Sequence, residues 1–315
     1  MILITGATGF IGRQIVEQFV SEGRAVRVLL DSGTSPEPGW KDRVQVVSGE
    51  LTDEQLVFRA VSDVHVIIHL ASAQWWGRKR DLEAVDLAGT RMIVAAARAA
   101  RVGRIILLSH LGAAPSSAYP LLRIKGMVEE AVRTSGLAYT ILRSGVVYGK
   151  RDSFINHIAM QLAVTPGIFL MPGRGEVALH PIHIDDLVLA FSRSLDRVQT
   201  VDEVIDFGGA EYITLEDLLL TVMRVTGIHR TIVSVPPYMV RWINGVYERL
   251  LPRTLITSQW LDILAANRTA PLGNTYQFFG FQPRRLEDTL LTYMRGERYF
   301  AAGLRYSFRR RPNRP

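Results

Sequence analysis

The first thirteen residues, MILITGATGFIGR, constrain the fold of this 315-residue chain more than any other segment. Residues 1–5 are apolar or β-branched without polar alternation, which predicts a strand buried on both faces. Three glycines follow with the spacing G-x-x-G-x-x-G, and residues 13–23 then have helical apolar spacing and end in a glycine. A strand, a glycine turn and a helix in this order predict the start of a dinucleotide-binding βαβ unit.

Each glycine of this motif has a separate physical task. Gly6 allows a tight turn, Gly9 allows a pyrophosphate to approach the backbone, and Gly12 lets the helix pack against the strand. The helix N-terminus presents free N–H groups and a positive dipole end to the phosphates. The alternative is a glycine turn without a ligand. We predict cofactor contacts along the whole turn, at Gly6, Thr8, Gly9, Phe10, Ile11, Gly12 and Arg13.

An acid stands at the end of the second apolar segment, AVRVLL, where dinucleotide-binding units place one. Asp31, nineteen residues after Gly12, is expected to accept hydrogen bonds from the adenosine ribose hydroxyls. A carboxylate there repels the 2′-phosphate of NADP, so the sequence favours NAD as the cofactor. Arg13 lies just behind the turn and could reach a phosphate, which leaves NADP as the alternative. A solvated loop acid is the other interpretation of Asp31.

Apolar strand-like segments alternate with helical segments five times within the first 110 residues. This alternation predicts an α/β fold with a doubly wound parallel sheet of the Rossmann type and right-handed crossovers. Ligands of such sheets bind beyond the C-terminal ends of the strands. His69 lies inside the fourth apolar segment and is expected to be a hydrogen-bonded core histidine rather than a ligand.

The composition excludes several classes of site. Cysteine is absent, which excludes disulfides and thiolate catalysis and fits a cytoplasmic protein. No apolar run reaches the roughly 18 residues of a membrane helix, and we expect no secretory signal. The net charge of +7 is concentrated in the last eighteen residues, which hold six arginines and no acid. We therefore expect no nucleic-acid partner for the body of the chain.

The motif GATGFIG resembles the glycine turn of the extended and atypical short-chain dehydrogenase/reductase family. The C-terminal pattern TSQWLDIL, then Asn267, then FGFQP resembles the atypical members grouped with the nucleotide-binding accessory subunit of respiratory complex I. The resemblance covers residues 1–294 and implies that NAD(P) binds. It adds cofactor contacts near the adenine, the nicotinamide ribose and the nicotinamide amide, at Glu50, Leu51, Leu70, Ala71, Ser72 and Val146.

The family's catalytic chemistry uses a tyrosine and a lysine four residues later on one helix face, with a serine or threonine after the fifth strand. Lys125 is in family register, but Leu121 stands where the tyrosine belongs. Tyr119 is six residues before the lysine, on a different face. Ser109 ends the fifth strand, while Leu111 occupies the position usual for the hydroxyl. Lys125, Ser109 and Tyr119 are thus the candidate catalytic residues of a degenerate site.

The second half is expected to divide between two lobes. Residues 1–150, with a return segment near 184–210, form the predicted nucleotide-binding domain. Residues 151–183 and 211–300 form a smaller substrate-side lobe, and residues 301–315 form a basic tail that is an arm from about Gly303. Asp185 is a predicted helix N-cap. We expect no metal site, because His180 and His183 would face opposite ways on a strand.

A helical segment at residues 237–250 carries an apolar stripe, Met239, Trp242, Val246, Tyr247 and Leu250. Most such stripes face a core, and a partner or membrane-surface role is the alternative.

Two functions from different classes remain open. The first is an NAD(P)-dependent oxidoreductase or epimerase acting on an unknown small molecule, with Gln74, Trp75 and Trp76 lining its pocket. The second is a redox-silent nucleotide-binding protein that assembles or stabilises a larger complex, which the displaced Tyr119 favours. The basic tail could dock on an acidic subunit or an anionic membrane surface, which makes the expected location cytoplasmic or peripheral to a membrane.

Overall fold

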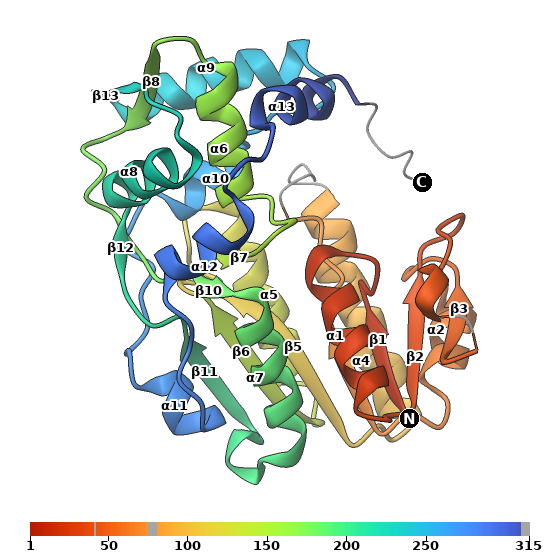
Figure 1. The fold of residues 1–315 in the computed structure, drawn as a ribbon. Coiled ribbons are helices and arrows are strands. Elements are labelled where there is room, and N and C mark those ends of the chain that lie inside the picture. Colours follow the sequence, from red (N-terminus) through yellow and green to blue (C-terminus); the bar gives the residue numbers. More distant parts are fainter. Residues whose placement is uncertain (41, 75–80, 310–315) are drawn as a thin grey trace. The chain divides into compact units, whose positions relative to one another are not determined.

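The computed structural model of the protein describes residues 1–40, 42–74 and 81–309 (Figure 1). Its chain divides into two compact units. Unit 1 consists of Met1–Ser144, Ile184–Phe207 and Pro271–Gln282. Unit 2 consists of Gly145–His183, Gly208–Ala270 and the described residues from Pro283 onward.

Unit 1 is built on a parallel sheet of seven strands in the order β11-β6-β5-β4-β1-β2-β3. The predicted Rossmann-type α/β fold is therefore confirmed. The first strand is buried as expected, because Leu3 and Ile4 have no exposed surface. The strands are β1 (Ile2–Thr5), β2 (Val26–Leu30), β3 (Val44–Ser48), β4 (Val66–His69), β5 (Arg104–His110), β6 (Ala138–Ser144) and β11 (Glu203–Phe207).

The winding direction of the sheet reverses at β1, which pairs with β2 on one side and with β4 on the other. The chain winds outward from this point in both directions, so the loops after β1 and β4 meet at one edge of the sheet. A crevice at such a reversal is the usual ligand site of open α/β sheets.

Helices pack on the sheet and on one another, α1 against α7 and α4 against both α2 and α5. The segment before α4 is a π-helix, η2, and two short 3₁₀ turns complete the unit. The helices of unit 1 are α1 (Phe10–Ser21), α2 (Glu54–Val61), η2 (Leu82–Ala88), α4 (Gly89–Ala99), α5 (Pro120–Arg133), α7 (Ile184–Asp196) and α11 (Asn274–Phe279), with η1 (Pro38–Trp40) and η3 (Val198–Thr200).

Among its described residues, unit 2 contains three two-stranded sheets and six helices. Thr214 caps the helix that follows it, because its hydroxyl accepts the N–H of Asp217 at 3.0 Å. The strand pairs are β7 (Val147–Tyr148) with β10 (Ile182–His183), β9 (Ala178–Leu179) with β12 (Ile213–Thr214), and β8 (Ile168–Pro172) with β13 (Thr231–Val235). The helices are α6 (Ile155–Val164), α8 (Leu215–Thr226), α9 (Pro237–Leu250), α10 (Ser258–Ile263), α12 (Leu286–Tyr293) and α13 (Tyr299–Phe308).

The segment after Gly303 is not the arm that we expected. The predicted arm from Gly303 is helical up to Phe308, because α13 packs on α6 and Gly303 is buried. A Cβ at Gly303 would lie 2.8 Å from the Val164 side chain, so the glycine permits this close approach. Residues 310–315 of the expected tail lie outside the described residues.

The expectation of an N-cap at Asp185 is also wrong, because α7 already begins at Ile184.

Residues 271–282 belong to unit 1, although we expected them in the substrate-side lobe. The reason is an aromatic and polar contact with β11. The rings of Phe279 and Phe207 lie 5.1 Å apart, and the Asn274 amide donates to the Asp206 carbonyl at 2.8 Å. Val146, an expected cofactor contact, lies in unit 2, because the first segment of unit 1 ends at Ser144.

The apolar stripe of α9 does not face a core, contrary to the expectation favoured by the sequence. Trp242 and Leu250 are among the most exposed large apolar side chains of the described residues. Only Val240 and Asn244 of this helix are buried. Among the described residues, no helix is both long and apolar enough to cross a membrane.

Candidate nucleotide-binding site

The glycine turn of unit 1 is shaped by close backbone contacts. Gly6 has φ +69°, and a Cβ there would lie 2.8 Å from the Ala71 nitrogen. A Cβ at Gly12 would lie 2.2 Å from the Gly6 oxygen, so only glycine allows α1 to begin this close to β1. Gly9 is the N-cap of α1 and provides no side-chain cap. The turn thus fits a pyrophosphate, whose oxygens can accept from backbone N–H groups at this helix end.

The predicted adenosine side of the site contains more negative than positive charge. Asp31 is exposed directly after β2, where its carboxylate can face a ribose. The guanidinium of Arg13 is 2.9 Å from the carboxylate of Glu37, and its Nε donates to the Thr8 carbonyl at 2.8 Å. Arg13 is therefore already partnered. Glu50 and Leu51 follow β3, and both are half-buried.

A buried ion pair joins three segments at the end of the sheet. The Lys125 Nζ on α5 lies 3.0 Å from Asp86 Oδ1 on η2 and donates to the Ser72 hydroxyl at 3.0 Å. Ser72, in the loop after β4, donates to the same carboxylate at 2.6 Å, and the Ala73 N–H donates to its other oxygen at 2.8 Å. Both charged side chains are almost fully buried. Lys125 and Ser72, predicted from different parts of the sequence, are thus brought together.

The loop after β4 is held at the same edge by Thr5 and His69. The N–H groups of Leu70 and Ala71 donate to the Thr5 hydroxyl at 3.2 and 3.3 Å. His69 is a core histidine as predicted, with Nδ1 2.8 Å from the Thr5 hydroxyl and Nε2 2.9 Å from the Thr90 hydroxyl. Burial, aided by the nearby Lys125 charge, lowers the pKa of His69 to about 4. Its imidazole is therefore neutral near pH 7.

The tyrosine position of the family motif is filled by a core leucine. Leu121 has no exposed surface, and it lies on α5 one turn before Lys125. Tyr119 is the N-cap of α5, in an extended conformation, with Pro120 as the first helical residue. An apolar packed side chain cannot exchange a proton with a substrate.

The candidate serine is engaged in a second buried network. The Ser109 hydroxyl donates to the carboxylate of Glu129, which is also paired with the Arg143 guanidinium at 2.5 Å. Ser109 and Glu129 are both buried. Leu111, at the position usual for the catalytic hydroxyl, is also buried. The hydroxyl of Ser109 is therefore bound to an acid of α5 rather than to Lys125.

Other predicted site residues have structural roles or cannot be placed. The His180 Nε2 is 2.9 Å from the Gly209 carbonyl oxygen, which accounts for this histidine without a metal. No group of three or more metal-binding side chains occurs among the described residues. Trp75 and Trp76 lie outside the described residues, and the neighbouring Gln74 is half-buried.

Sequence reasoning missed Asp86 and Glu129, the two buried acids of these networks. No local signal distinguishes them, because the exposed acids Glu83 and Glu130 lie on the same helical segments. Burying such a carboxylate requires a paired cation or several hydrogen bonds. Lys125 and Glu129 are four residues apart on α5, yet Lys125 pairs with Asp86 of η2 and Glu129 pairs with Arg143 of β6.

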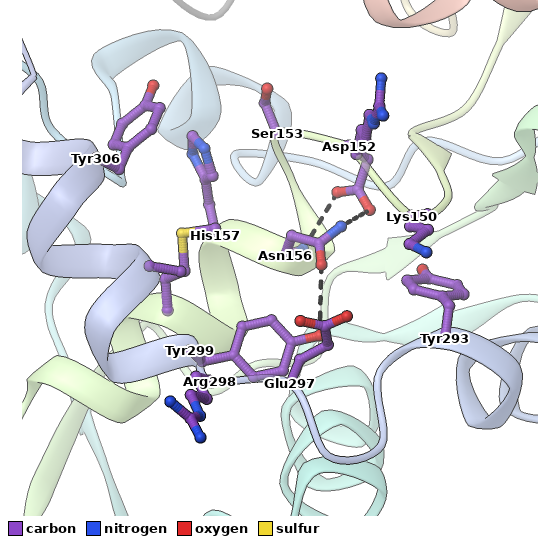
Figure 2. Close-up of a pocket in the computed structure, with 13 residues that line it drawn as sticks. Lys150, Asp152, Ser153, Asn156, His157, Tyr293, Glu297, Arg298, Tyr299 and Tyr306 are labelled. Atoms are coloured by element: carbon purple, nitrogen blue, oxygen red, sulfur yellow. Dashed lines mark hydrogen bonds between the residues drawn. The ribbon is translucent and has the colours of Figure 1, made fainter.

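Sequence reasoning also missed a cavity of about 410 Å³ in unit 2, beside α6 and α13 (Figure 2). Its lining includes three cations, Lys150, Arg151 and Arg298. The carboxylate of Asp152 accepts the N–H groups of Phe154 and Asn156, at 2.7 and 3.2 Å, and burial raises its pKa to about 6. These bonds fix the loop that precedes α6.

Comparison with known proteins supports the nucleotide site. Residues 6–160 match a family model described as NAD(P)H-binding. A nucleoside-diphosphate-sugar epimerase from Staphylococcus aureus has the same fold, with a TM-score of 0.76 at 15% identity over 92% of this chain and 99% of that one. The fold that the resemblance implies is thereby confirmed.

Three relatives represent different kinds of protein. Subunit 9 of the NADH dehydrogenase [ubiquinone] 1 alpha subcomplex of Rattus norvegicus is 26% identical over 78% of this chain and 66% of its own length. This chain thus spans just under two thirds of that relative. The photosystem II assembly factor Ycf39 of Guillardia theta is 26% identical over 96% of this chain and 95% of its length. A ceramide reductase of Caulobacter vibrioides is 31% identical over 62% of this chain and 61% of its length.

Separating Lys125 from Asp86 should be costly, because either partner alone is a buried unpaired charge. We expect Lys125→Met to lower the free energy of unfolding by about 3–5 kcal/mol. In a double-mutant cycle with Asp86→Asn, urea unfolding should give a coupling energy of about 1–3 kcal/mol. The exposed pair Arg24–Asp196, at 2.8 Å in the same unit, is the control and should give less than about 1 kcal/mol. Equal coupling energies for the two pairs would contradict this assignment.

His69 should resist protonation well below pH 6.5. Its folded pKa lies below the unfolded value, so the stability that it contributes is present at neutral pH and is lost as pH falls from 6.5 towards 4. In NMR titrations its ring should stay neutral at pH 5.5. The variant His69→Gln should show a smaller loss of unfolding free energy between pH 7 and pH 4.5. Titration of His69 near pH 6.5 would refute the assignment.

Proposed function

We propose that this chain binds NAD(H) in unit 1 and retains it as a redox-silent nucleotide, as a component or assembly factor of a larger protein complex. The observation that carries the proposal is Leu121, a fully buried side chain four residues before Lys125. Bound NADH would supply a hydride, but a hydride acceptor that becomes an alcohol also needs a proton. Neither Leu121 nor Leu111 can provide one.

The residues around the site support positioning rather than proton transfer. Lys125 and Ser72 are bound to Asp86, and Ser109 is bound to Glu129. In this arrangement Lys125 would orient the ribose of the cofactor, and the glycine turn would hold the pyrophosphate. The relatives named as a complex subunit and as an assembly factor support the role in a complex.

A second candidate is an NAD(P)-dependent oxidoreductase or epimerase with an unusual proton source. The similarity to a ceramide reductase favours it, as does the retained Lys125. In that case the proton must come from a group other than Tyr119. The proposed substrate-side lobe would then be unit 2.

Both functions leave the basic residues beyond Arg309 unexplained. Arg310, Arg311 and Arg314 lie outside the described residues. We propose that they contact an acidic subunit or an anionic surface, because no acid neutralises them within the last eighteen residues.

NAD(H) should bind more tightly than NADP(H). A 2′-phosphate would face Asp31 while Arg13 is paired with Glu37, which should cost roughly 1–3 kcal/mol, about 5- to 150-fold in affinity. Isothermal titration calorimetry with NADH and NADPH measures this difference. Asp31→Ser should reduce the difference in affinity between NADH and NADPH. The control Glu17→Ser, which removes an exposed acid of α1, should leave this difference unchanged. Equal or tighter NADPH binding by the unmodified chain would contradict the NAD preference.

Tyr119 should be dispensable for binding and for any turnover. NADH oxidation can be followed by absorbance with a panel of ketones and quinones, and we expect no acceleration over the protein-free reaction. If one substrate is turned over, Tyr119→Phe should change the turnover rate less than threefold. The reason is that Tyr119, at the N-cap of α5, does not lie on the helix face that carries Lys125. A thousandfold fall would restore an ordinary dehydrogenase with a shifted tyrosine.

A further inference from the structure

Helix α9 of unit 2 presents its apolar residues to solvent. Tyr238, Trp242 and Leu250 are 71%, 72% and 73% exposed, although their four-residue spacing with Val246 forms one continuous stripe. Met239 and Tyr247 widen the stripe on one side. A contiguous apolar surface on a helix is normally buried, so its exposure marks an interaction site.

Polar contacts hold the opposite face of α9 against its own unit. The Arg241 guanidinium lies 2.9 Å from the carboxylate of Asp262 on α10. The carboxylate of Glu248 accepts the Asn244 amide at 2.9 Å and the Ser258 N–H at 3.1 Å. The large apolar side chains of the stripe therefore face outward, whereas Val240, Asn244 and the bonded polar groups face the protein. The orientation of α9 is fixed, and the stripe cannot turn inward without breaking these bonds.

Helix α13 also presents apolar side chains to solvent. Phe300 and Phe308 are 57% and 68% exposed, and Leu304 lies between them at the same four-residue spacing. The opposite face carries Tyr299 and Gly303, which are buried. The small Gly303 lets α13 lie close to α6, which anchors the helix with its aromatic residues outward.

The ends of the two helices meet, so their stripes belong to one part of unit 2. The N–H of Arg253, just after α9, donates to the Ser307 carbonyl at 3.4 Å, and its guanidinium lies over the Tyr306 ring at 5.5 Å. Figure 1 shows α9 and α13 at the same end of this unit. We call the combined surface the α9–α13 face. It consists of Tyr238, Met239, Trp242, Val246, Tyr247, Leu250, Phe300, Leu304 and Phe308.

The exposed charged side chains of α9 and α13 themselves are positive. Arg249, Arg305 and Arg309 are exposed on or next to the two helices. The acid of α9, Glu248, is turned toward Asn244 and Ser258, and residues 298–315 contain no acid. The surface therefore combines an apolar, aromatic centre with a basic rim.

We propose that the α9–α13 face docks on an anionic phospholipid membrane, with both helices lying in its headgroup region. Tryptophan and tyrosine favour this depth, because their rings are apolar with one polar atom. Arginines add attraction to anionic lipid headgroups. Helices of this kind lie in the interface plane and do not span it, in agreement with the length of α9. The inference concerns unit 2 alone and does not depend on the nucleotide site.

Vesicle binding tests the proposal with the full chain. In sedimentation with vesicles of phosphatidylcholine and phosphatidylglycerol, the wild type should bind, and binding to phosphatidylcholine alone should be at least tenfold weaker. Trp242→Ser/Leu250→Ser should reduce binding to the anionic vesicles at least tenfold. The matched control is Val198→Ser/Tyr276→Ser, which removes two exposed apolar side chains of unit 1 and should bind like the wild type.

Tryptophan fluorescence reports the depth of α9. The emission of the wild type should shift to the blue on anionic vesicles, because Trp242 is exposed whereas Trp40 and Trp260 are already buried. In Trp242→Phe the chain should still bind, but the shift should be largely lost. Circular dichroism and thermal unfolding of each variant establish that it is folded.

Three results would overturn the proposal. The first is absence of binding to anionic vesicles by the wild type. The second is equal loss of binding in the unit 1 control. The third is a concentration-dependent dimer, seen by light scattering, that Trp242→Ser/Leu250→Ser dissociates, since the face would then be an interface between two copies. A truncation after Arg309 that still binds would support docking by the helices themselves.

Discussion

The buried ion pair between Lys125 and Asp86 is the interaction on which the nucleotide-binding end of unit 1 depends. It joins α5, η2 and the loop after β4, three segments that approach one another only because the parallel sheet places them at one edge. Each charge would be costly to bury alone, and together with Ser72 they form a satisfied network. The pair therefore fixes the position of a lysine that the family uses to hold the cofactor ribose.

The rest of the site fits the proposed holding function better than it fits proton transfer. The turn from Gly6 to Gly12 keeps the geometry that a pyrophosphate needs, and a side chain at either glycine would collide with the backbone. In contrast, Leu121 and Leu111 are part of the core, and Ser109 is bound to Glu129. Binding and chemistry are thus separable here, because the first depends on backbone shape and the second on hydroxyl groups that are missing or engaged.

The sequence was sufficient for features that depend on local pattern. The strand before Gly6, the helix behind it and the alternation that builds the sheet follow from periodicity and glycine spacing, and the structure confirms them. The core position of His69 also followed, because a buried histidine inside an apolar strand needs hydrogen-bond partners. The prediction that failed concerns the direction in which a helix face points. Periodicity located the stripe of α9, but it cannot tell which side of a helix faces the protein.

The partners of buried charges also depend on tertiary structure. The pairing of Asp86 with Lys125 and Ser72 spans distant parts of the chain, and no local pattern specifies it. The expected arm after Gly303 was wrong for a related reason. Its composition of arginine and aromatic residues suggests little to bury, but a single glycine allows close contact with α6 and makes the helix part of unit 2.

A crystal or cryo-electron microscopy structure of the chain with NADH would test most directly whether the nucleotide is held without tyrosine-dependent chemistry. We predict the pyrophosphate against the turn from Gly6 to Gly12, the ribose in contact with Lys125, and Leu121 rather than a hydroxyl beside the nicotinamide. A Tyr119 hydroxyl within hydrogen-bond distance of the nicotinamide ribose would contradict the redox-silent site. Failure to find NADH at the glycine turn would contradict the predicted binding mode itself.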